Sequence, residues 1–500
     1  MKKKGIVAAI DFWGVSDPER IAYQTSEKNY TYKELKQSSD ALGYYLEKRL
    51  LEKGPIVVFG NLEFEMVVAF LGASKAGHAY LPIDAQTPKE RIEAILRVAE
   101  PSMIISLNDW EIETEIPVIH KDCLHSIITL MVEYPFEQPV KENENFYLIF
   151  TSGTTGEPKG VQISHDNLVS FVDWVLTDFP IKEGERFLAQ APFSFDLSVF
   201  TLYPALVSGG IISPLSKEIV QDFQKLFTVL PQLELNFWVS TPSFVDMCLM
   251  DPAFDAIHLP ELSTFIFCGE ELTKKTAQAL VARFPLADIY NTYGPTEATV
   301  AISSVLITKE ILARYERLPI GYVKSDTAVS ILKKGEGDRG EILITGPSVS
   351  KGYLNNPEKT KEVFFQTTGG RQSYRTGDAG YLAEDGLLFI EGRIDQQVKL
   401  HGYRIELGDI EHALLKDERI NQAIVVPKYQ GSKVQQLVAF VVLNEETPDA
   451  NYQLARSIKQ GLSDFLMDYM IPQRVIFIDQ LPQTNNGKID RKALTAEVNR

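Results

Sequence analysis

A loop rich in hydroxyls and glycines, residues 151–160, has the most pronounced chemical character in this chain. It reads Thr-Ser-Gly-Thr-Thr-Gly-Glu-Pro-Lys-Gly and follows the apolar residues 146–150, which are typical of a buried strand. Glycines let backbone N–H groups approach a polyanion, hydroxyls donate further hydrogen bonds, and Lys159 adds a positive charge. The loop therefore predicts a site for the phosphates of a nucleotide. A solvated turn after a strand is the structural alternative.

The spacing in this loop differs from that of the common phosphate loop. That motif reads G-x-x-x-x-G-K-[ST], and its final hydroxyl binds Mg²⁺. Here Gly156 is followed by Glu157, and Lys159 is followed by Gly160. The sequence therefore argues against a P-loop NTPase.

Another glycine pattern, residues 335–340, satisfies the dinucleotide fingerprint G-x-G-x-x-G. That fingerprint requires a strand before it and a helix after it. Residues 327–332 and 341–345 both have strand-like sequences. We therefore predict a hairpin turn rather than a nucleotide site.

Residues 291–297, Asn-Thr-Tyr-Gly-Pro-Thr-Glu, bring aromatic, hydroxyl, amide and carboxylate groups together. Tyr293 can stack on a purine, and Asn291 or Thr292 can hydrogen-bond to its edge. Glu297 can ligate Mg²⁺, a hard cation that takes carboxylate and phosphate oxygens. A Gly-Pro turn with exposed polar residues is the alternative.

Length and composition indicate a globular protein of several structural units. The chain has 500 residues, of which 44 % are hydrophobic and 23 % are charged. Its net charge of −17 argues against binding to nucleic acid or to an anionic membrane. The three cysteines, Cys123, Cys248 and Cys268, form no C-x-x-C pair, so they suggest neither a zinc site nor a disulfide framework. Such usage fits a reducing cytoplasm.

The sequence predicts neither a signal peptide nor membrane insertion. The amino-terminal apolar run breaks at Asp11, earlier than in a secretory signal. No stretch approaches the roughly 18 uninterrupted apolar residues that a transmembrane helix needs.

Alternating elements in the first part of the chain predict α/β layers with a largely parallel sheet. The apolar residues 56–60 and 103–107 read as buried strands, and residues 65–75 and 88–97 between them read as helices. Beyond about residue 325, strand-like pieces and turns indicate a smaller β-rich subdomain.

From residue 392 onward, the pattern changes to that of a small α+β domain. A strand is followed by a helix over 407–415, strands at 423–426 and 437–442, and a helix near 454–467. We place the domain boundary near residues 393–395.

Several motifs in fixed order resemble the ANL superfamily of adenylate-forming enzymes, which comprises acyl-CoA synthetases, luciferases and peptide-synthetase adenylation domains. Its signature, [ST]-S-G-[ST]-T-G-x-P-K-G, is matched at every position of 151–160. The other segments that resemble core motifs are residues 30–35, 75–84, 195–198, 291–297, 340–357, 374–378, 392–411 and 486–491.

This resemblance implies a division of labour between two domains. Residues 1–393 would form a large N-terminal adenylation domain, with layered α/β subdomains and the β-rich subdomain, that binds ATP and an amino acid. Residues 394–500 would form a mobile C-terminal domain that turns about the hinge residue Asp395 and carries the catalytic Lys488. The implied ATP-binding residues are Thr151, Ser152, Gly153, Thr154, Thr155, Gly156, Lys159, Asn291, Thr292, Tyr293, Gly294, Pro295, Thr296, Asp378, Arg393 and Lys488.

Charged residues in the later motifs have specific implied roles. Asp378, in an Arg-Thr-Gly-Asp loop, can accept hydrogen bonds from both ribose hydroxyls, although a plain Gly-Asp turn is an alternative. Lys488 lies on a turn-forming tip, where lysines are usually solvated. The resemblance implies that Lys488 bridges the acyl oxygen and the α-phosphate, and that Glu297 is catalytic through Mg²⁺. Fixed cations are the expected remedy when a carboxylate attacks a phosphate.

Asp196 indicates the substrate type. In amino-acid-activating members of the superfamily, the matching carboxylate pairs with the α-ammonium group of the substrate. The apolar neighbours of Asp196 make an unpaired buried charge costly, and a cationic ligand would relieve that cost. A helix N-cap is the structural alternative.

Cys268 and Val300 refine this expectation. In the superfamily both positions border the amino-acid pocket, together with Asp196 and Lys488. The resemblance is strongest to members that activate D-alanine, in which a cysteine crowds the Cα substituent and favours the D-enantiomer. A small buried hydrophobe is the alternative for Cys268.

His401 is a departure from the family pattern, since many relatives have arginine there. This difference leaves the details of carrier or phosphate contact open.

The resemblance to this superfamily therefore implies an ATP- and Mg²⁺-dependent ligase of the cytoplasm. It would convert D-alanine to D-alanyl-AMP and transfer it to the phosphopantetheine thiol of a D-alanyl carrier protein, for D-alanylation of lipoteichoic and teichoic acids. The chain ends soon after the last motif, so we expect the carrier to act in trans. The alternatives are a stand-alone enzyme for another small amino acid, an acyl-CoA synthetase for a small acid, which Asp196 disfavours, and a non-catalytic ATP-binding paralogue.

Overall fold

The computed structural model describes residues 5–130, 132, 136, 138–152, 157–333, 338–395, 397–431, 433–445, 452–483 and 489–499. Its backbone packing divides the chain into two compact units. The first unit comprises Met1–Ala85, Ala99–Ile149 and Gly160–Gly392, and the second comprises Gln86–Val98, Phe150–Lys159 and Arg393–Arg500. The sequence did not predict that the two short internal segments group with the C-terminal part of the chain.

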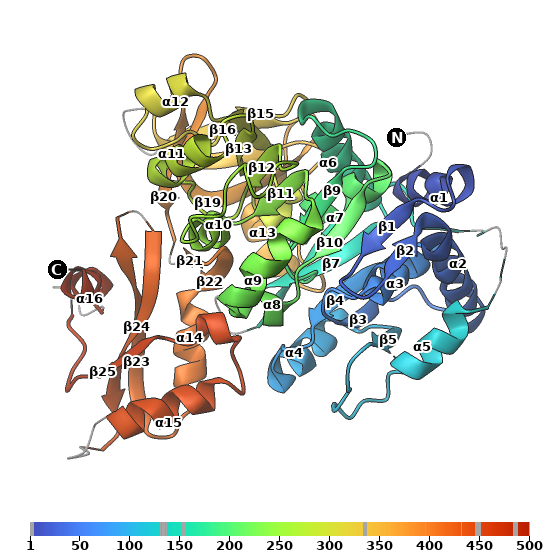
Figure 1. The fold of residues 1–500 in the computed structure, drawn as a ribbon. Helices are drawn as coiled ribbons and strands as arrows, with labels where there is room; N and C mark the ends of the chain where they lie inside the picture. The colour runs from blue at the N-terminus through green and yellow to red at the C-terminus, as the bar shows by residue number, and fades with distance from the viewer. Residues whose placement is uncertain are drawn as a thin grey trace. The chain divides into compact units, whose positions relative to one another are not determined.

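A six-stranded sheet forms one layer of the first unit. Its order is β6 (Val118–His120), β5 (Met103–Ser106), β3 (Ile56–Gly60), β4 (Tyr80–Asp84), β7 (Asn145–Thr151) and β8 (Lys159–Ser164). The pairs from β6 to β7 are parallel. Every residue of β3 is buried, as expected for a strand covered on both faces. Helices α3 (Phe64–Lys75) and α5 (Lys121–Ile128) pack beside these strands, and α2 (Tyr32–Arg49) packs against both helices (Figure 1).

A nine-stranded sheet forms the other large layer. Its order is β15 (Tyr322–Val323), β14 (Ser303–Leu306), β13 (Asp288–Tyr293), β12 (Thr264–Phe267), β11 (Phe237–Ser240), β9 (Arg186–Ala189), β10 (Ile211–Pro214), β1 (Ile21–Gln24) and β2 (Asn29–Thr31). The strands from β13 to β1 pair in parallel, whereas both edges are antiparallel. The predicted α/β fold with largely parallel sheets is confirmed.

The predicted β-rich subdomain is a five-stranded antiparallel sheet in the first unit. Its path is β16 (Ala328–Lys333), β17 (Gly340–Thr345), β19 (Gln372–Leu382) and β18 (Phe364–Gln366), and β20 (Leu388–Arg393) pairs with β19. Strands β16 and β17 pair in antiparallel register up to Lys333 and Gly340. The predicted hairpin is therefore confirmed by its strands, although residues 334–337 lie outside the described part of the chain.

The second unit is the predicted small α+β domain. Strands β21 (Gln397–Leu400) and β22 (Tyr403–Glu406) form a hairpin that leads into α14 (Leu407–Leu414). The long strands β23 (Ile420–Gln430) and β24 (Lys433–Leu443) pair side by side, and β25 (Arg474–Phe477) adds to β24 (Figure 1). Helix α15 (Tyr452–Leu462) ends earlier than predicted, just after Gly461, a weak helix former. Helices α4 (Lys89–Ala99) and α16 (Arg491–Val498) and the 3-10 helix η3 (Asp468–Met470) also belong to this part of the structure.

No helix in the part of the chain that the structure describes combines the length and apolar character that crossing a bilayer requires.

Candidate active site

Two predicted nucleotide motifs meet in the first unit. Tyr293, the last residue of β13, donates a 2.6 Å hydrogen bond from its hydroxyl to Oδ2 of Asp378 in β19. Both residues are buried, and 85 residues separate them in the sequence. The residues before Tyr293 are fixed by main-chain contacts: Asn291 Nδ2 donates to the carbonyl of Pro319, and Thr292 Oγ1 donates to that of Phe267. The fold thus assembles a polar corner from strands β13 and β19.

Asp378 is held in place by neighbours that the sequence analysis did not single out. Gly377, with φ +69°, occupies the left-handed region that glycine tolerates. Its N–H donates to Oε1 of Glu341 at 3.1 Å, and the other carboxylate oxygen of Glu341 pairs with Arg375 at 2.7 Å. The N–H of Asp378 donates to Thr376 Oγ1 at 3.0 Å. The carboxylate of Asp378 therefore projects from a segment of β19 whose backbone shape is fixed by these hydrogen bonds.

Glu297 is almost fully buried, with 1 % of its surface exposed. The hydroxyl of Tyr353 donates to its Oε1 at 2.7 Å, and the N–H of Ser350 donates to its main-chain carbonyl at 2.8 Å. A buried carboxylate needs hydrogen bonds or a cation to offset its lost hydration. Tyr353 and Ser350 lie within residues 340–357, one of the segments that resemble core motifs, and that resemblance could have pointed to them.

The chain turns sharply after Glu297. Thr299 and Val300 have φ values of +58° and +68°, in the left-handed region that β-branched residues rarely adopt. Such residues cost on the order of 1–3 kcal/mol each and persist where the surroundings enforce them. The thiol of Cys268, just after β12, donates to the carbonyl of Val300 at an Sγ–O distance of 3.7 Å. The structure thus brings the predicted pocket residues Cys268 and Val300 into direct contact.

Asp196 lies at the start of α7 (Leu197–Val207) and is buried. Asp196 occupies the N-cap position of this helix, as the structural alternative predicted, but its side chain makes no capping hydrogen bond. Tyr147, on β7, is close enough for the negative charge of Asp196 to act on it. The pKa of Tyr147 is raised well above its ordinary value, chiefly by burial and further by the charges of Tyr80 and Asp196. Among the described residues, the buried hydroxyl of Tyr147 has no hydrogen-bond partner.

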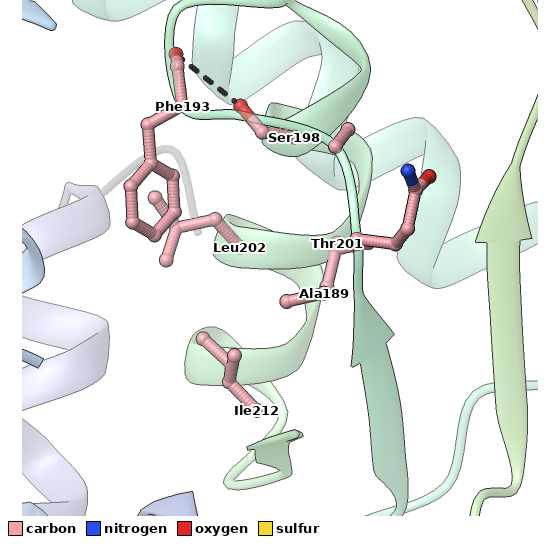
Figure 2. A pocket seen from close by; sticks show the side chains of 8 residues that line it. Ala189, Phe193, Ser198, Thr201, Leu202 and Ile212 are labelled. Atoms are coloured by element: carbon pink, nitrogen blue, oxygen red, sulfur yellow. Dashed lines mark hydrogen bonds between the residues drawn. The ribbon is translucent and has the colours of Figure 1, made fainter. Parts of the chain in front are cut away.

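An apolar pocket lies beside the first turns of α7. Figure 2 shows Phe193, Thr201, Leu202 and Ile212 around it, with Ser198 Oγ donating to the carbonyl of Phe193. None of the predicted ligand residues lines this pocket. We therefore do not assign the amino acid to it.

In the second unit, two residues of the 151–160 loop contact strand β22. Ser152 Oγ donates to the carbonyl of Arg404 at 2.9 Å and accepts from the N–H of Glu406 at 3.2 Å. Lys159 Nζ lies 3.3 Å from Glu406 Oε1, and both side chains are largely buried. Thr151 ends β7. Gly153, Thr154, Thr155 and Gly156 lie outside the described residues.

The predicted hinge region follows β20. Arg393 Nε donates to Asp395 Oδ1 at 2.8 Å, so the two residues form an ion pair. His401 and Gly402 connect β21 to β22, and both have positive φ, +53° and +83°. A two-residue hairpin turn with this backbone suits glycine and tolerates histidine at some cost. Lys488 lies outside the described residues.

A magnesium ion would have to use few protein ligands. Within the described residues, no group of three or more His, Cys, Asp or Glu side chains could hold a metal ion. Mg²⁺ commonly takes one or two carboxylates and completes its shell with substrate phosphates and water. The buried carboxylate of Glu297 fits that pattern.

Comparisons with known proteins show the family of the chain. Residues 12–354 match the family model "AMP-binding enzyme", and residues 409–488 match "AMP-binding enzyme C-terminal domain". The D-alanine–D-alanyl carrier protein ligase of Lacticaseibacillus rhamnosus is 49 % identical, and the alignment covers 99 % of each chain. The ligase of the same name from Lactiplantibacillus plantarum is 48 % identical over 99 % of each chain.

Solved structures share the fold at low identity. An o-succinylbenzoate CoA synthetase of Bacillus subtilis aligns over 98 % of each chain with a TM-score of 0.84 and 19 % identity. An adenylation domain of Vibrio cholerae, solved with glycyl-adenosine-5'-phosphate, aligns over 99 % of this chain and 97 % of its own with a TM-score of 0.80 and 24 % identity.

Proposed function

The chain belongs to the AMP-binding enzyme family, in the ANL superfamily of adenylate-forming enzymes, and from that membership we propose that it activates D-alanine and loads it onto a carrier protein. The observation that supports this most strongly is the 49 % identity to a D-alanine–D-alanyl carrier protein ligase over 99 % of both chains.

The first half-reaction forms a mixed anhydride. A carboxylate oxygen of D-alanine attacks the α-phosphorus of ATP, the bond to the bridging oxygen breaks, and pyrophosphate leaves. The 151–160 loop and Lys159 would hold the β- and γ-phosphates, and Asp378 would accept hydrogen bonds from the ribose. Tyr293 stacks on the adenine in this proposal, with Asn291 to Thr296 around the base. Glu297 would hold Mg²⁺, which neutralises phosphate charge when bound.

The amino acid would lie between Asp196 and the turn at Val300. Asp196 pairs with the α-ammonium group, and Cys268, in contact with Val300, limits the space beside Cα. Lys488 adds its positive charge between the acyl oxygen and the α-phosphate, where negative charge accumulates as the two groups approach. Burial of Asp196 and Cys268 in a dry environment strengthens both the charge pairing and the steric restriction.

The second half-reaction moves the acyl group to a thiol. The phosphopantetheine sulfur of a D-alanyl carrier protein, acting in trans, attacks the carbonyl of D-alanyl-AMP, AMP leaves, and a thioester forms. We propose that the C-terminal domain turns about Asp395 between the two steps, with Arg393 beside it. The product would supply D-alanine for lipoteichoic and teichoic acids, and the use of ATP places the reaction in the cytoplasm.

Amino-acid-dependent exchange between ATP and labelled pyrophosphate tests this function. We expect exchange with D-alanine to exceed that with L-alanine, glycine and acetate. Faster exchange with L-alanine or glycine would replace the D-alanine assignment by another small amino acid. No exchange with any of the four would favour a non-catalytic paralogue.

The role of Lys488 has its own test. We expect Lys488→Ala to abolish exchange while ATP affinity, measured by equilibrium dialysis, falls only modestly. Lys492→Ala, which removes an exposed lysine of α16, is the matched control and should keep wild-type exchange. Exchange that survives in Lys488→Ala would disprove the catalytic role.

A further inference from the structure

The turn from Glu297 to Ala301 connects two parts of the proposed site. Glu297 lies at one end, and the carbonyl of Val300, which accepts from the Cys268 thiol, lies at the other. Two consecutive β-branched residues, Thr299 and Val300, have left-handed backbone conformations. Backbone strain of this kind persists only where neighbouring contacts enforce it, and it is concentrated at functional sites.

A side-chain hydroxyl enforces this conformation. Thr299 is fully buried, and its Oγ1 donates to the carbonyl of Ser348 at 2.7 Å. Backbone bonds tighten the turn on either side: the N–H of Ala301 donates to the carbonyl of Thr299 at 2.8 Å, and that of Ile302 to the carbonyl of Tyr293 at 2.7 Å. The Thr299 hydroxyl therefore ties the strained part of this turn to the loop after β17, whereas the bond from Tyr353 holds its other end at Glu297.

The turn also packs tightly against the backbone beneath it. A Cβ atom added at Gly294 would lie 2.5 Å from Cα of Ala301 and 2.7 Å from the carbonyl oxygen of Val300. Glycine is therefore required at that position for the turn to approach so closely. Loss of the Thr299 hydroxyl would leave the turn supported from Gly294 but not anchored to Ser348, so we expect Val300 to shift.

We infer that Thr299 is a positioning residue for the amino-acid pocket: its hydroxyl, by holding the strained turn against Ser348, sets the place of Val300 and thereby the selectivity for the Cα substituent. This inference rests on the proposed function. Thr299 touches no substrate in this scheme and acts through Val300 and its contact with Cys268. Glu297 has separate contacts to Tyr353 and Ser350, so the effect belongs to the amino acid rather than to the nucleotide.

The test compares Thr299→Val with Thr299→Ser in pyrophosphate exchange. Valine keeps the shape and β-branching but removes the donor, whereas serine keeps the donor. We expect Thr299→Val to raise the KM for D-alanine about tenfold and to lower the D-alanine to L-alanine preference, with the KM for ATP within twofold of wild type. Thr299→Ser should retain the wild-type preference.

Ser303→Ala is the matched control, since Ser303 Oγ also donates a buried 2.7 Å bond to a main-chain carbonyl, that of Ile320. It should lower Tm without changing the D-alanine preference. A folded Thr299→Val variant with wild-type KM and preference would overturn the inference. An altered preference in Thr299→Ser would also overturn it. The serine variant can be measured even if the valine variant does not fold. Wild-type enzyme without D-alanine exchange would instead refute the proposed function, and the preference would then be measured for the amino acid that it does activate.

Discussion

At the scale of single residues, Glu297 is the proposed Mg²⁺ ligand, and the neighbouring Tyr353 is the residue that orients it. Burial of a carboxylate without hydrogen bonds is unfavourable, and the Tyr353 hydroxyl provides one at 2.7 Å. If Glu297 binds Mg²⁺, its orientation depends on that hydroxyl. Tyr353 therefore positions the proposed metal ligand and takes no direct part in the reaction.

We predict that Tyr353→Phe raises the Mg²⁺ concentration for half-maximal exchange by roughly threefold to tenfold, because the carboxylate of Glu297 loses its orienting donor. The measurement is a Mg²⁺ titration of the exchange rate at saturating ATP and D-alanine. Tyr32→Phe serves as control, since Tyr32 is also buried and donates at 2.7 Å, but to the carbonyl of Gly210. An unchanged Mg²⁺ requirement in folded Tyr353→Phe would argue against Glu297 as the ligand.

The sequence revealed the motif residues but not the residues that hold them in place, because those contacts join distant parts of the chain. The residues Asn291 to Glu297 and Asp378 were predicted from their chemical types. The hydrogen bond from Tyr353 to Glu297 joins residues that are 56 positions apart, and no periodic sequence pattern predicts it. The left-handed backbone at Thr299 was equally hidden, since threonine usually avoids that conformation.

At the scale of elements, continuous apolar runs were the most reliable signal. Strand β3 begins and ends at the predicted residues 56 and 60, because a strand buried on both faces needs an unbroken apolar sequence. The hairpin of β21 and β22 was not predicted in this form. Its turn at His401 and Gly402 contains neither the Asn-Gly nor the Asp-Gly pair that usually marks a two-residue turn.

A contact between two helices should make stability depend on pH. The N–H of Ile6, at the start of α1 (Ile6–Ser16), donates to Nε2 of His165, the first residue of α6 (His165–Asp178), at 3.3 Å. Burial lowers the pKa of His165 from its ordinary value of 6.5, although the nearby Asp166 opposes this shift. The unfolded chain therefore binds the proton more readily, so the stabilisation is complete above about pH 6.5 and declines as the pH falls below it.

His165→Gln tests this dependence because an amide oxygen can accept the same bond without titrating. We expect its Tm to fall less than that of wild type between pH 7.5 and pH 5.5, measured by calorimetry. Some dependence of Tm on pH should remain in this variant, because burial also lowers the pKa of His78. An identical slope for His165→Gln would exclude His165 as a source of the acid sensitivity.

At the scale of the whole molecule, the domain scheme drawn from the sequence placed the phosphate loop in the large domain. The structure groups Phe150–Lys159 with the C-terminal unit, where Ser152 and Lys159 contact β22. The sequence could not show this, because Lys159 and Glu406 are separated by 247 residues and each belongs to a different motif. The lysine proposed for the β- and γ-phosphates is therefore paired with the carboxylate of Glu406 in this structure.

This pairing predicts competition between Glu406 and ATP. Phosphate oxygens and the Glu406 carboxylate would both accept from Lys159 Nζ, so Glu406→Gln should lower the KM for ATP by roughly threefold to tenfold while leaving the KM for D-alanine unchanged. Glu411→Gln is the matched control, since it weakens another carboxylate pair of the same unit, that with Arg491, and should lower Tm without changing the KM for ATP. If Glu406→Gln raises the KM for ATP, Glu406 positions Lys159 for the phosphates instead of competing with them, and the pair is part of the binding site.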